Sequence, residues 1–575
     1  MIDLSERLAG ILLPAFALRR DDDLGIGDTA AIKQAIDFCA RNNCAVLQLL
    51  PINETGGDNS PYNAISSIAL DPVLLTIEPN VVPGLTTADL AELAAPAVVS
   101  DVQTGAVDYP KVKQLKFQLL RRAFDNFQKQ PNRAELVDFE NFQREQMAWL
   151  PDYTLFRTLI ELHGGNACWT QWLAEQRTPK AAEKWLSSSP DSTKLTTTRQ
   201  FFAFVQWVAF TQWRDVRKHS DAQKVRLMGD IPFGVSRYSA DVWANQELFD
   251  LDWSGGAPPE TWFKDDLFTA KWGQNWGLPL YHWDAHKKQK FLWWRQRVQK
   301  VVEIFHYFRI DHVLGFFRIY SFPWQPEQNG EYLELSEAEA KKKTGGRLPQ
   351  FLPRSDEEDE DAEKNAADGA ALLEMILDAS GNAGVVAEDL GSMVPPYVRP
   401  LLQKLGIPGF TIPYWERTED QELKLKETLP ELSLATYATH DHTPLKLFYE
   451  DAVKSWLGPD GDAGWLEIQR LMRFLGLDKD APPKEFTPEL HRQFMKALLE
   501  TPCWLAVFMI TDLLGTSERF NQPGTSGASN WSRRLDYPLA QYEKTKPYSE
   551  RISDFAKLVK ETRRLPQAWP VGTIR

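Results

Sequence analysis

Eight short apolar runs, most of them followed by a polar or glycine-containing loop, constrain the fold of this chain more than any other feature. Several are apolar almost throughout, as parallel strands buried on both faces are. Long helical or irregular stretches separate them, and this alternation predicts an α/β fold, a (β/α)8 TIM barrel with inserted, mainly helical subdomains. The runs are Ala9–Leu13, Ala45–Leu50, Val225–Ile231, Tyr307–Ile310, Val385–Ala387, Phe410–Ile412, Leu434–Thr439 and Leu505–Ile510.

An open doubly wound sheet is the alternative fold. It would place a glycine-rich phosphate turn after an early strand, and the sequence contains neither G-x-G-x-x-G nor G-x-x-x-x-G-K-[ST]. The 575 residues exceed one average domain, so three or four small domains would also fit the length. The uneven spacing of the runs favours one catalytic barrel over residues 1–575 that carries insertions.

Three insertions are expected from that spacing. A helical subdomain over residues 72–222 would lie between strands 2 and 3, with helical patterns at Tyr109–Phe127 and Phe139–Glu161. A loop or lid over 235–300 would follow strand 3. A third insertion over 321–380 would separate strands 4 and 5, and its acidic run Ser355–Glu363 is expected to form a solvated, partly mobile loop.

Charge and cysteine usage exclude several classes of function. The formal net charge is −14, whereas a nucleic-acid-binding protein would need a basic surface. The four cysteines form no C-x-x-C pair, which argues against structural zinc and predicts reduced thiols in a cytoplasmic protein. The apolar run Leu8–Leu18 is preceded by acids rather than by the basic residues of a signal peptide, and we expect a buried strand there and no membrane partner. The oligomeric state stays open.

Carboxylates stand at the ends of three of the predicted strands. Arg309 and Asp311 are two residues apart on one strand and therefore share a side, where an arginine would hold a nucleophilic carboxylate ionised. Glu388 directly follows three apolar residues, and partial burial would raise its pKa as a general acid requires. Asp441 follows His440 at the end of the seventh run.

Each of these motifs alone is more often structural: a salt bridge, a helix cap or, for His440-Asp441, a metal site. Three carboxylates at the rim of one barrel fit glycoside chemistry better. One attacks the anomeric carbon, one protonates the leaving oxygen, and the third stabilises the oxocarbenium-like transition state or holds ring hydroxyls. A retaining mechanism would require the two principal carboxyl groups of Asp311 and Glu388 about 5–5.5 Å apart.

Ordered motifs around these residues resemble the 4-α-glucanotransferases, also called amylomaltases or disproportionating enzymes, of the α-amylase clan. The likeness covers nearly the whole chain. The motifs are Gly10-Ile11-Leu12-Leu13, Gly25-Ile26-Gly27-Asp28, Leu47-Gln48-Leu49-Leu50-Pro51-Ile52, Ser60-Pro61-Tyr62, Gly229-Asp230-Ile231-Pro232, Ser239-Ala240-Asp241-Val242-Trp243, Gly256-Ala257-Pro258-Pro259, Trp272-Gly273-Gln274-Asn275-Trp276-Gly277, Arg309-Ile310-Asp311-His312, Ala387-Glu388-Asp389-Leu390-Gly391, Thr439-His440-Asp441, Asn521-Gln522-Pro523-Gly524-Thr525 and Asn530-Trp531.

The resemblance implies a retaining double displacement without metal or organic cofactor, on maltooligosaccharides or α-glucans as donor and acceptor. Asp311 would be the nucleophile, Glu388 the acid/base and Asp441 the transition-state stabiliser. The substrate-binding residues it implies are Tyr62, Ser60, Asp230, Gln274, Trp276, Arg309, His312, His440 and Asn530. The loop Gly255–Trp276 and the Ser60–Tyr62 loop are the candidates for excluding water.

Three positions depart from the family pattern. Tyr238 stands where an acidic residue is frequent, Leu278 where Asn is frequent, and His442 where Asn or Asp is frequent. None of them is a catalytic group, and they bear on the acceptor side. Two rivals remain at this point. An α-glucan hydrolase of the same clan would use identical carboxylates, and a non-catalytic glycan-binding barrel would share the fold.

Overall fold

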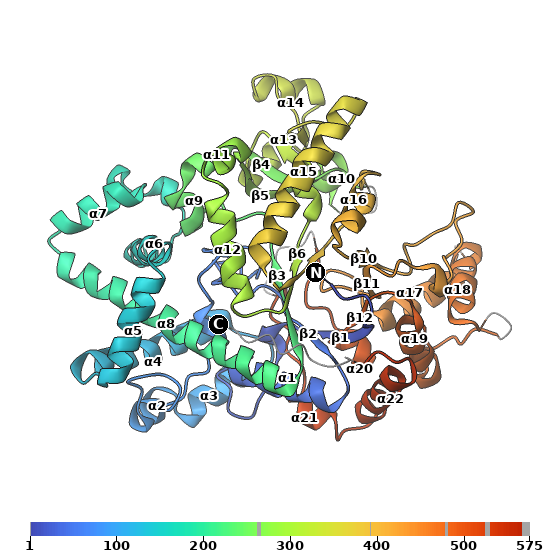
Figure 1. Cartoon of the computed structure of the whole chain (residues 1–575), viewed down its shortest axis with the longest axis horizontal. Coiled ribbons are helices and arrows are strands. Elements are labelled where there is room, and N and C mark those ends of the chain that lie inside the picture. Colours follow the sequence, from blue (N-terminus) through green and yellow to red (C-terminus); the bar gives the residue numbers. More distant parts are fainter. Residues whose placement is uncertain are drawn as a thin grey trace.

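The structure is a computed structural model that describes residues 2–260, 266–391, 393–459, 461–477, 481–523 and 529–565 (Figure 1). Its centre is an eight-stranded, wholly parallel sheet with the strand order β10-β11-β12-β1-β2-β3-β6-β9. The strands are β1 (Leu8–Leu12), β2 (Val46–Gln48), β3 (Arg226–Ile231), β6 (Tyr307–Ile310), β9 (Gly384–Ala387), β10 (Gly409–Thr411), β11 (Ser433–Thr436) and β12 (Leu505–Met509).

The sheet curls into a barrel, because its two outer strands meet. The amide of Ala387 at the end of β9 donates to the carbonyl of Pro408, just before β10, at 2.9 Å. Each strand lies beside the strand that precedes it in this set along the chain, as in a (β/α)8 barrel. The predicted barrel is confirmed, and each of the eight apolar runs overlaps one of its strands.

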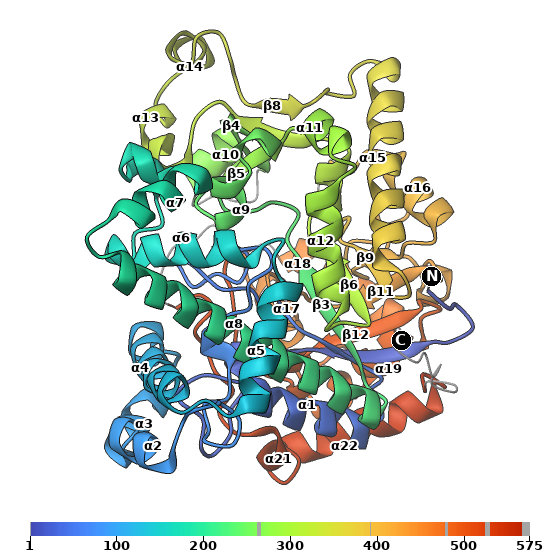
Figure 2. The ribbon, with the colours of Figure 1, turned by 60° about the vertical axis from the view of Figure 1, so that its left-hand side comes forward.

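Helices pack around the barrel (Figures 1 and 2). They are α1 (Thr29–Arg41), α2 (Thr87–Leu93), α3 (Pro96–Gln103), α4 (Tyr109–Lys129), α5 (Arg133–Glu145), α6 (Leu150–Leu162), α7 (Pro179–Ser188), α8 (Ser192–Gln223), α9 (Ala240–Ala244), α10 (Leu267–Trp272), α11 (Trp283–Lys288), α12 (Leu292–Val302), α13 (Asn329–Tyr332), α14 (Glu337–Lys343), α15 (Asp359–Ser380), α16 (Val398–Leu405), α17 (Leu445–Trp456), α18 (Gly461–Leu475), α19 (Pro488–Glu500), α20 (Ile510–Leu514), α21 (Leu539–Tyr542) and α22 (Tyr548–Glu561).

Seven helices, α2 to α8, lie between β2 and β3. The pattern at Tyr109–Phe127 forms α4, and the pattern at Phe139–Glu161 is divided between α5 and α6. The chain leaves the helix at Gln146 and begins α6 at Leu150, followed by Pro151 in the first turn. Proline has no amide hydrogen to donate to the preceding turn, so it suits the start of a helix and cannot continue one.

A second sheet stands beside the barrel, and the sequence analysis did not anticipate it. It is antiparallel with the order β5-β4-β7-β8, and it joins parts of the insertions expected over 235–300 and 321–380. Its strands are β4 (Phe249–Ala257), β5 (Gln274–Tyr281), β7 (Ile319–Phe322) and β8 (Gln350–Leu352). The residues 261–265 of the expected lid lie outside the described part of the chain.

The acidic run Ser355–Glu363 is only in its first half the loop that was expected. Its second half is the first turn of α15, where Asp359, Glu360 and Asp361 lie at the positive end of the helix dipole. Asp356, in its first half, forms an ion pair with Arg318 at 2.7 Å. The run therefore begins a helix and anchors it, because local electrostatics favour carboxylates at a helix N-terminus.

Two further expectations concern cysteines and membranes. The four cysteines are free, and Cys39, Cys44 and Cys503 are buried. Among the described helices, none combines the length and the apolar character that a bilayer span requires.

Candidate active site

A cleft of about 1090 Å³ opens over the carboxyl ends of the barrel strands. The barrel supplies its floor, and residues of the second sheet, including Gln274 and Trp276 on β5, supply part of its wall. Nine of the twelve predicted site residues line it: Ser60, Tyr62, Gln274, Trp276, Arg309, Asp311, His312, Glu388 and Asp441. The ends of the barrel strands therefore bring together predicted site residues that are up to 381 positions apart in the sequence, from Ser60 to Asp441.

The buried guanidinium of Arg309 organises one side of the cleft. One nitrogen donates to Asp230 at 2.5 Å and to the Tyr62 hydroxyl at 3.2 Å. The other donates to Asp311 at 2.6 Å, which confirms that Arg309 and Asp311 share a side of their strand. Burial alone would lower the pKa of Arg309, but the surrounding carboxylates outweigh it and raise the pKa well above its usual value. The arginine is therefore a fixed positive charge.

Asp230 lies beneath this cluster at the end of β3, beside Arg309 on the neighbouring strand. Its side chain is buried, and it accepts from the Tyr62 hydroxyl at 2.8 Å. Burial raises the pKa of Asp230 to about 6, against the opposing effect of Arg309. Asp230 thus holds both the arginine and the tyrosine from below, and it is absent from the residues that line the cleft.

Glu388 accepts hydrogen bonds from two backbone amides, one to each carboxylate oxygen. The amide of His312 donates to one carboxylate oxygen at 2.8 Å, and the amide of Leu390 donates to the other at 3.0 Å. His312 has a φ of 49°, a left-handed conformation rare outside glycine, and this sharp turn directly after Asp311 turns its amide towards Glu388. Burial raises the pKa of Glu388 to about 8, with Arg309 opposing and Asp311 reinforcing the shift.

Asp311 and Glu388 face each other across the same guanidinium nitrogen. That nitrogen lies 2.6 Å from an oxygen of Asp311 and 4.0 Å from an oxygen of Glu388. The two oxygens cannot be further apart than these two distances together. This upper limit allows the separation of about 5–5.5 Å between the two carboxyl groups of retaining glycosidases. It reaches only the lower edge of the range of roughly 6.5–9.5 Å in inverting glycosidases.

Asp441 belongs to a different cluster on the other side of the cleft. The amide of Asn521 donates to one of its oxygens at 2.6 Å, and Nε2 of His440 lies 3.1 Å from the other. Burial would raise the pKa of Asp441, but His440 and Asn521 outweigh it and hold the pKa well below the usual range. Asp441 is therefore ionised at neutral pH in the folded protein.

Aromatic rings connect the two clusters. The ring of Tyr62 stacks on His440, with centroids 5.1 Å apart and planes inclined by 17°, and Trp531 packs against both rings. On the opposite wall, the partly exposed Trp276 meets His312 edge-on at 4.9 Å. Burial lowers the pKa of His312 to about 4, so its imidazole is neutral at pH 7.

Two predicted residues besides Asp230 lie outside the cleft lining. His440 is buried behind Tyr62. Asn530 exchanges hydrogen bonds with the backbone of Gln522, which does line the cleft. Of the three departures, Leu278 and His442 line the cleft, whereas Tyr238 does not. Gly524 and Thr525 of the motif before Asn530 lie outside the described residues.

The sequence reasoning assigned no role to Arg519, Asn521 or Trp415. Arg519 donates to the backbone carbonyl of Asp441 at 3.1 Å, Asn521 binds its carboxylate, and the half-exposed Trp415 lines the cleft. The sequence contained one signal that these three residues share, namely their position after a barrel strand. Arg519 and Asn521 follow the last barrel strand and Trp415 follows β10, and loops after parallel strands gather at one rim.

The fold and this site define a class of protein. A barrel whose strand ends present an ionised aspartate, Asp441, and a buried, protonated glutamate, Glu388, is suited to enzymes that act on glycosidic bonds. Among the described residues, no group of three or more His, Cys, Asp or Glu side chains is placed to hold a metal ion.

Comparisons with known proteins identify the family within that class. The sequence model of the 4-alpha-glucanotransferase family matches residues 13–540. The 4-alpha-glucanotransferase of Chlamydia caviae is 30% identical over 96% of this chain and 94% of that relative, and the one of Aquifex aeolicus is 30% identical over 92% and 96%. The chain belongs to the 4-alpha-glucanotransferase family.

Solved structures share the fold. The amylomaltase of Streptococcus agalactiae in complex with acarbose superposes with a TM-score of 0.73 at 23% identity, over 98% of this chain and 100% of that one. The amylomaltase of Corynebacterium glutamicum gives a TM-score of 0.76 at 20% identity, over 96% of this chain and 75% of that one.

Proposed function

We propose that this enzyme transfers a segment of a 1,4-α-D-glucan to the 4-hydroxyl of an acceptor glucose or glucan by a retaining double displacement. Asp311 is the nucleophile, Glu388 the general acid and base, and Asp441 the transition-state stabiliser. The observation that carries the proposal is the joint position of Asp311 and Glu388 on one Arg309 nitrogen, beneath an open cleft.

The first half-reaction uses the difference between the two carboxyl groups. An oxygen of Asp311 attacks the anomeric carbon of the donor, and the glycosidic carbon–oxygen bond breaks. Glu388, protonated at pH 7 because burial raises its pKa to about 8, gives its proton to the departing 4-oxygen. The positive charge that develops on the ring faces Asp441, which stays ionised through His440 and Asn521.

The second half-reaction reverses the roles. Glu388, now a carboxylate, accepts the proton of the incoming 4-hydroxyl, and that oxygen displaces Asp311 from the anomeric carbon. Two inversions leave the α-configuration unchanged. The backbone amides of His312 and Leu390 keep Glu388 in one position for both steps.

Transfer requires that a sugar hydroxyl reaches the intermediate before water does. The cleft walls supply surfaces for this: Tyr62 and Trp276 offer aromatic faces, and Ser60 and Gln274 offer hydroxyl and amide groups to sugar hydroxyls. The helices between β2 and β3, proposed as a subdomain over 72–222, support one of these walls. Arg157 of α6 pairs at 2.8 Å with Glu54, which stands at the base of the loop that carries Ser60 and Tyr62.

The donor and acceptor are proposed to be maltooligosaccharides or longer α-glucans, and the free cysteines agree with a cytoplasmic location. Incubation with maltotriose tests the function. We expect glucose together with a ladder of oligosaccharides longer than maltotriose, resolved by chromatography. Glucose and maltose alone would show a hydrolase instead. No product at all would show a glycan-binding barrel.

A further inference from the structure

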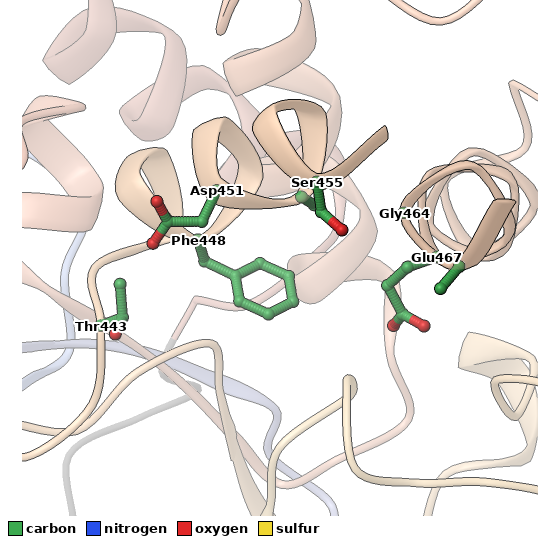
Figure 3. Close-up of a pocket in the computed structure, with 8 residues that line it drawn as sticks. Thr443, Phe448, Asp451, Ser455, Gly464 and Glu467 are labelled. Atoms are coloured by element: carbon green, nitrogen blue, oxygen red, sulfur yellow. The ribbon is translucent and has the colours of Figure 1, made fainter. Parts of the chain in front are cut away.

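A second hollow of about 300 Å³ lies between α17 and α18, outside the catalytic cleft (Figure 3). It is at the lower end of the roughly 300–1,000 Å³ of small-molecule sites, so it has room for a short stretch of a chain. We call it the α17–α18 groove. The side chains that matter for the argument are those of Thr443, Phe448, Asp451, Ser455 and Glu467.

Small residues create the groove. A Cβ atom on Gly464 of α18 would lie 2.1 Å from the backbone nitrogen of Trp456, so glycine is required for the helices to approach at this end. Trp456 and Trp465 pack against each other there, with ring centroids 4.8 Å apart. Beside this contact, Ala452 and Ala463 leave the space between the helices unfilled.

The chemistry of the groove suits a neutral polyol. Figure 3 shows the ring of Phe448 in the middle, with the carboxylates of Asp451 and Glu467 on either side of it. Among the described residues that line the groove there is no lysine or arginine, which disfavours an anionic ligand. An apolar ring beside hydroxyl and carboxylate acceptors matches a sugar, which presents C–H faces and hydroxyl donors.

The lining is also held in place. One face of the Phe448 ring stacks on the buried Tyr414, with centroids 4.1 Å apart. Arg417 and Arg470 donate to the two oxygens of Glu467 at 2.8 and 3.2 Å, which leaves lone pairs on a fixed carboxylate. A site that is ordered before binding loses less conformational entropy when a ligand arrives.

The groove adjoins the catalytic cleft through two segments. Thr443, at its edge, follows Asp441 by two positions, and Arg519 bonds to both, to the Thr443 hydroxyl at 3.4 Å and to the Asp441 carbonyl at 3.1 Å. Tyr414, beneath Phe448, precedes Trp415, which lines the cleft. The groove therefore lies beside the two segments that carry Asp441 and Trp415 into the cleft.

We propose that the α17–α18 groove is an additional glucan-binding site that holds part of a long chain whose reacting end lies in the cleft. This inference rests on the proposed function for the identity of the ligand. A second site on the same chain raises the effective concentration of the reacting end and strengthens binding of long glucans without affecting short ones.

A pair of tryptophan variants on α18 tests this. Ala463→Trp places a large side chain in the groove at an exposed position, and Gln469→Trp makes the same addition at an exposed position outside the groove lining. With amylose as donor and glucose as acceptor, Ala463→Trp should raise the KM for amylose on the order of fivefold. Its kcat/KM for maltotriose should stay within about twofold of the unmodified enzyme, and Gln469→Trp should change neither value.

Asp451→Ala is the milder second variant, because Asp451 is exposed and its loss leaves the helix intact. It should raise the KM for amylose about two- to threefold. Equal changes in the kinetic constants for amylose and for maltotriose would overturn the proposal, since they would reflect a distortion of the segment that carries Asp441. An unchanged KM for amylose in both variants would also overturn it. The proposed function fails separately, if the unmodified enzyme forms no ladder from maltotriose.

Discussion

The two sides of the cleft treat their carboxylates in opposite ways. On one side Asp230, Asp311 and Glu388 gather around a single guanidinium, and Glu388, buried under two backbone amides, has a pKa raised to about 8. On the other side Asp441 accepts from Asn521 beside His440, and its pKa is lowered. Glu388 is thus an acid and Asp441 a permanent anion, so environment rather than residue type separates their roles.

The largest expected effect comes from removing the reacting groups of the Arg309 side. Asp311→Asn deletes the nucleophile, and Glu388→Gln deletes the group that moves the proton. Each should lower kcat for disproportionation of maltotriose about 10⁴-fold or more. Thermal unfolding of both variants serves as the control, and activity within tenfold of the unmodified enzyme for either one would refute its assignment.

Arg309→Lys tests the same cluster more specifically. A lysine keeps the charge, but its single nitrogen cannot contact Asp230 and Asp311 together as the two guanidinium nitrogens do. We expect kcat/KM to fall on the order of 100-fold, because the nucleophile is displaced rather than removed. Steady-state kinetics on maltotriose measure this. A loss of kcat/KM below threefold would mean that the positive charge alone, and not the pair of guanidinium nitrogens, positions Asp311.

The smallest effect is expected on the Asp441 side, from Asn521→Ala. The variant removes one donor to the Asp441 carboxylate, so the carboxylate stays ionised beside His440 but loses a contact that orients it towards the substrate. Activity at neutral pH should fall about tenfold. The alkaline limb belongs to Glu388, which must be protonated, so activity should fall tenfold per pH unit above about pH 8 in both proteins.

This pH profile separates the two clusters directly. Asn521→Ala should leave both limbs in place, because Asp441 stays ionised over the working range. Arg309→Lys should shift the alkaline limb, because Arg309 opposes the rise of the pKa of Glu388. Without the close guanidinium, that pKa should rise further and the limb should move to higher pH. A profile in which both limbs move together in either variant would show that the two sides titrate as one unit.

The prediction from sequence succeeded where the signal is local. Apolar runs bounded by polar loops marked all eight barrel strands, because a strand buried on both faces cannot alternate polar and apolar residues. It failed at the second sheet, since β4, β5 and β8 are only partly buried, and β7, though mostly buried, is a run of four residues that includes a serine. It also failed in the second half of Ser355–Glu363, where acidic residues typical of a solvated loop begin α15.

The sequence by itself determined the barrel and the strand-end positions of Asp311, Glu388 and Asp441. Each buried strand is a short apolar run followed by polar residues, and this pattern is visible within the run itself. Only the tertiary structure decided which groups meet across the cleft. Asn521 reaches Asp441 over 80 positions of sequence, and Tyr62 reaches Asp230 over 168. The pKa values also belong to this level, since they depend on burial and on charges brought close by packing. The α17–α18 groove likewise exists only because two helices approach at one glycine.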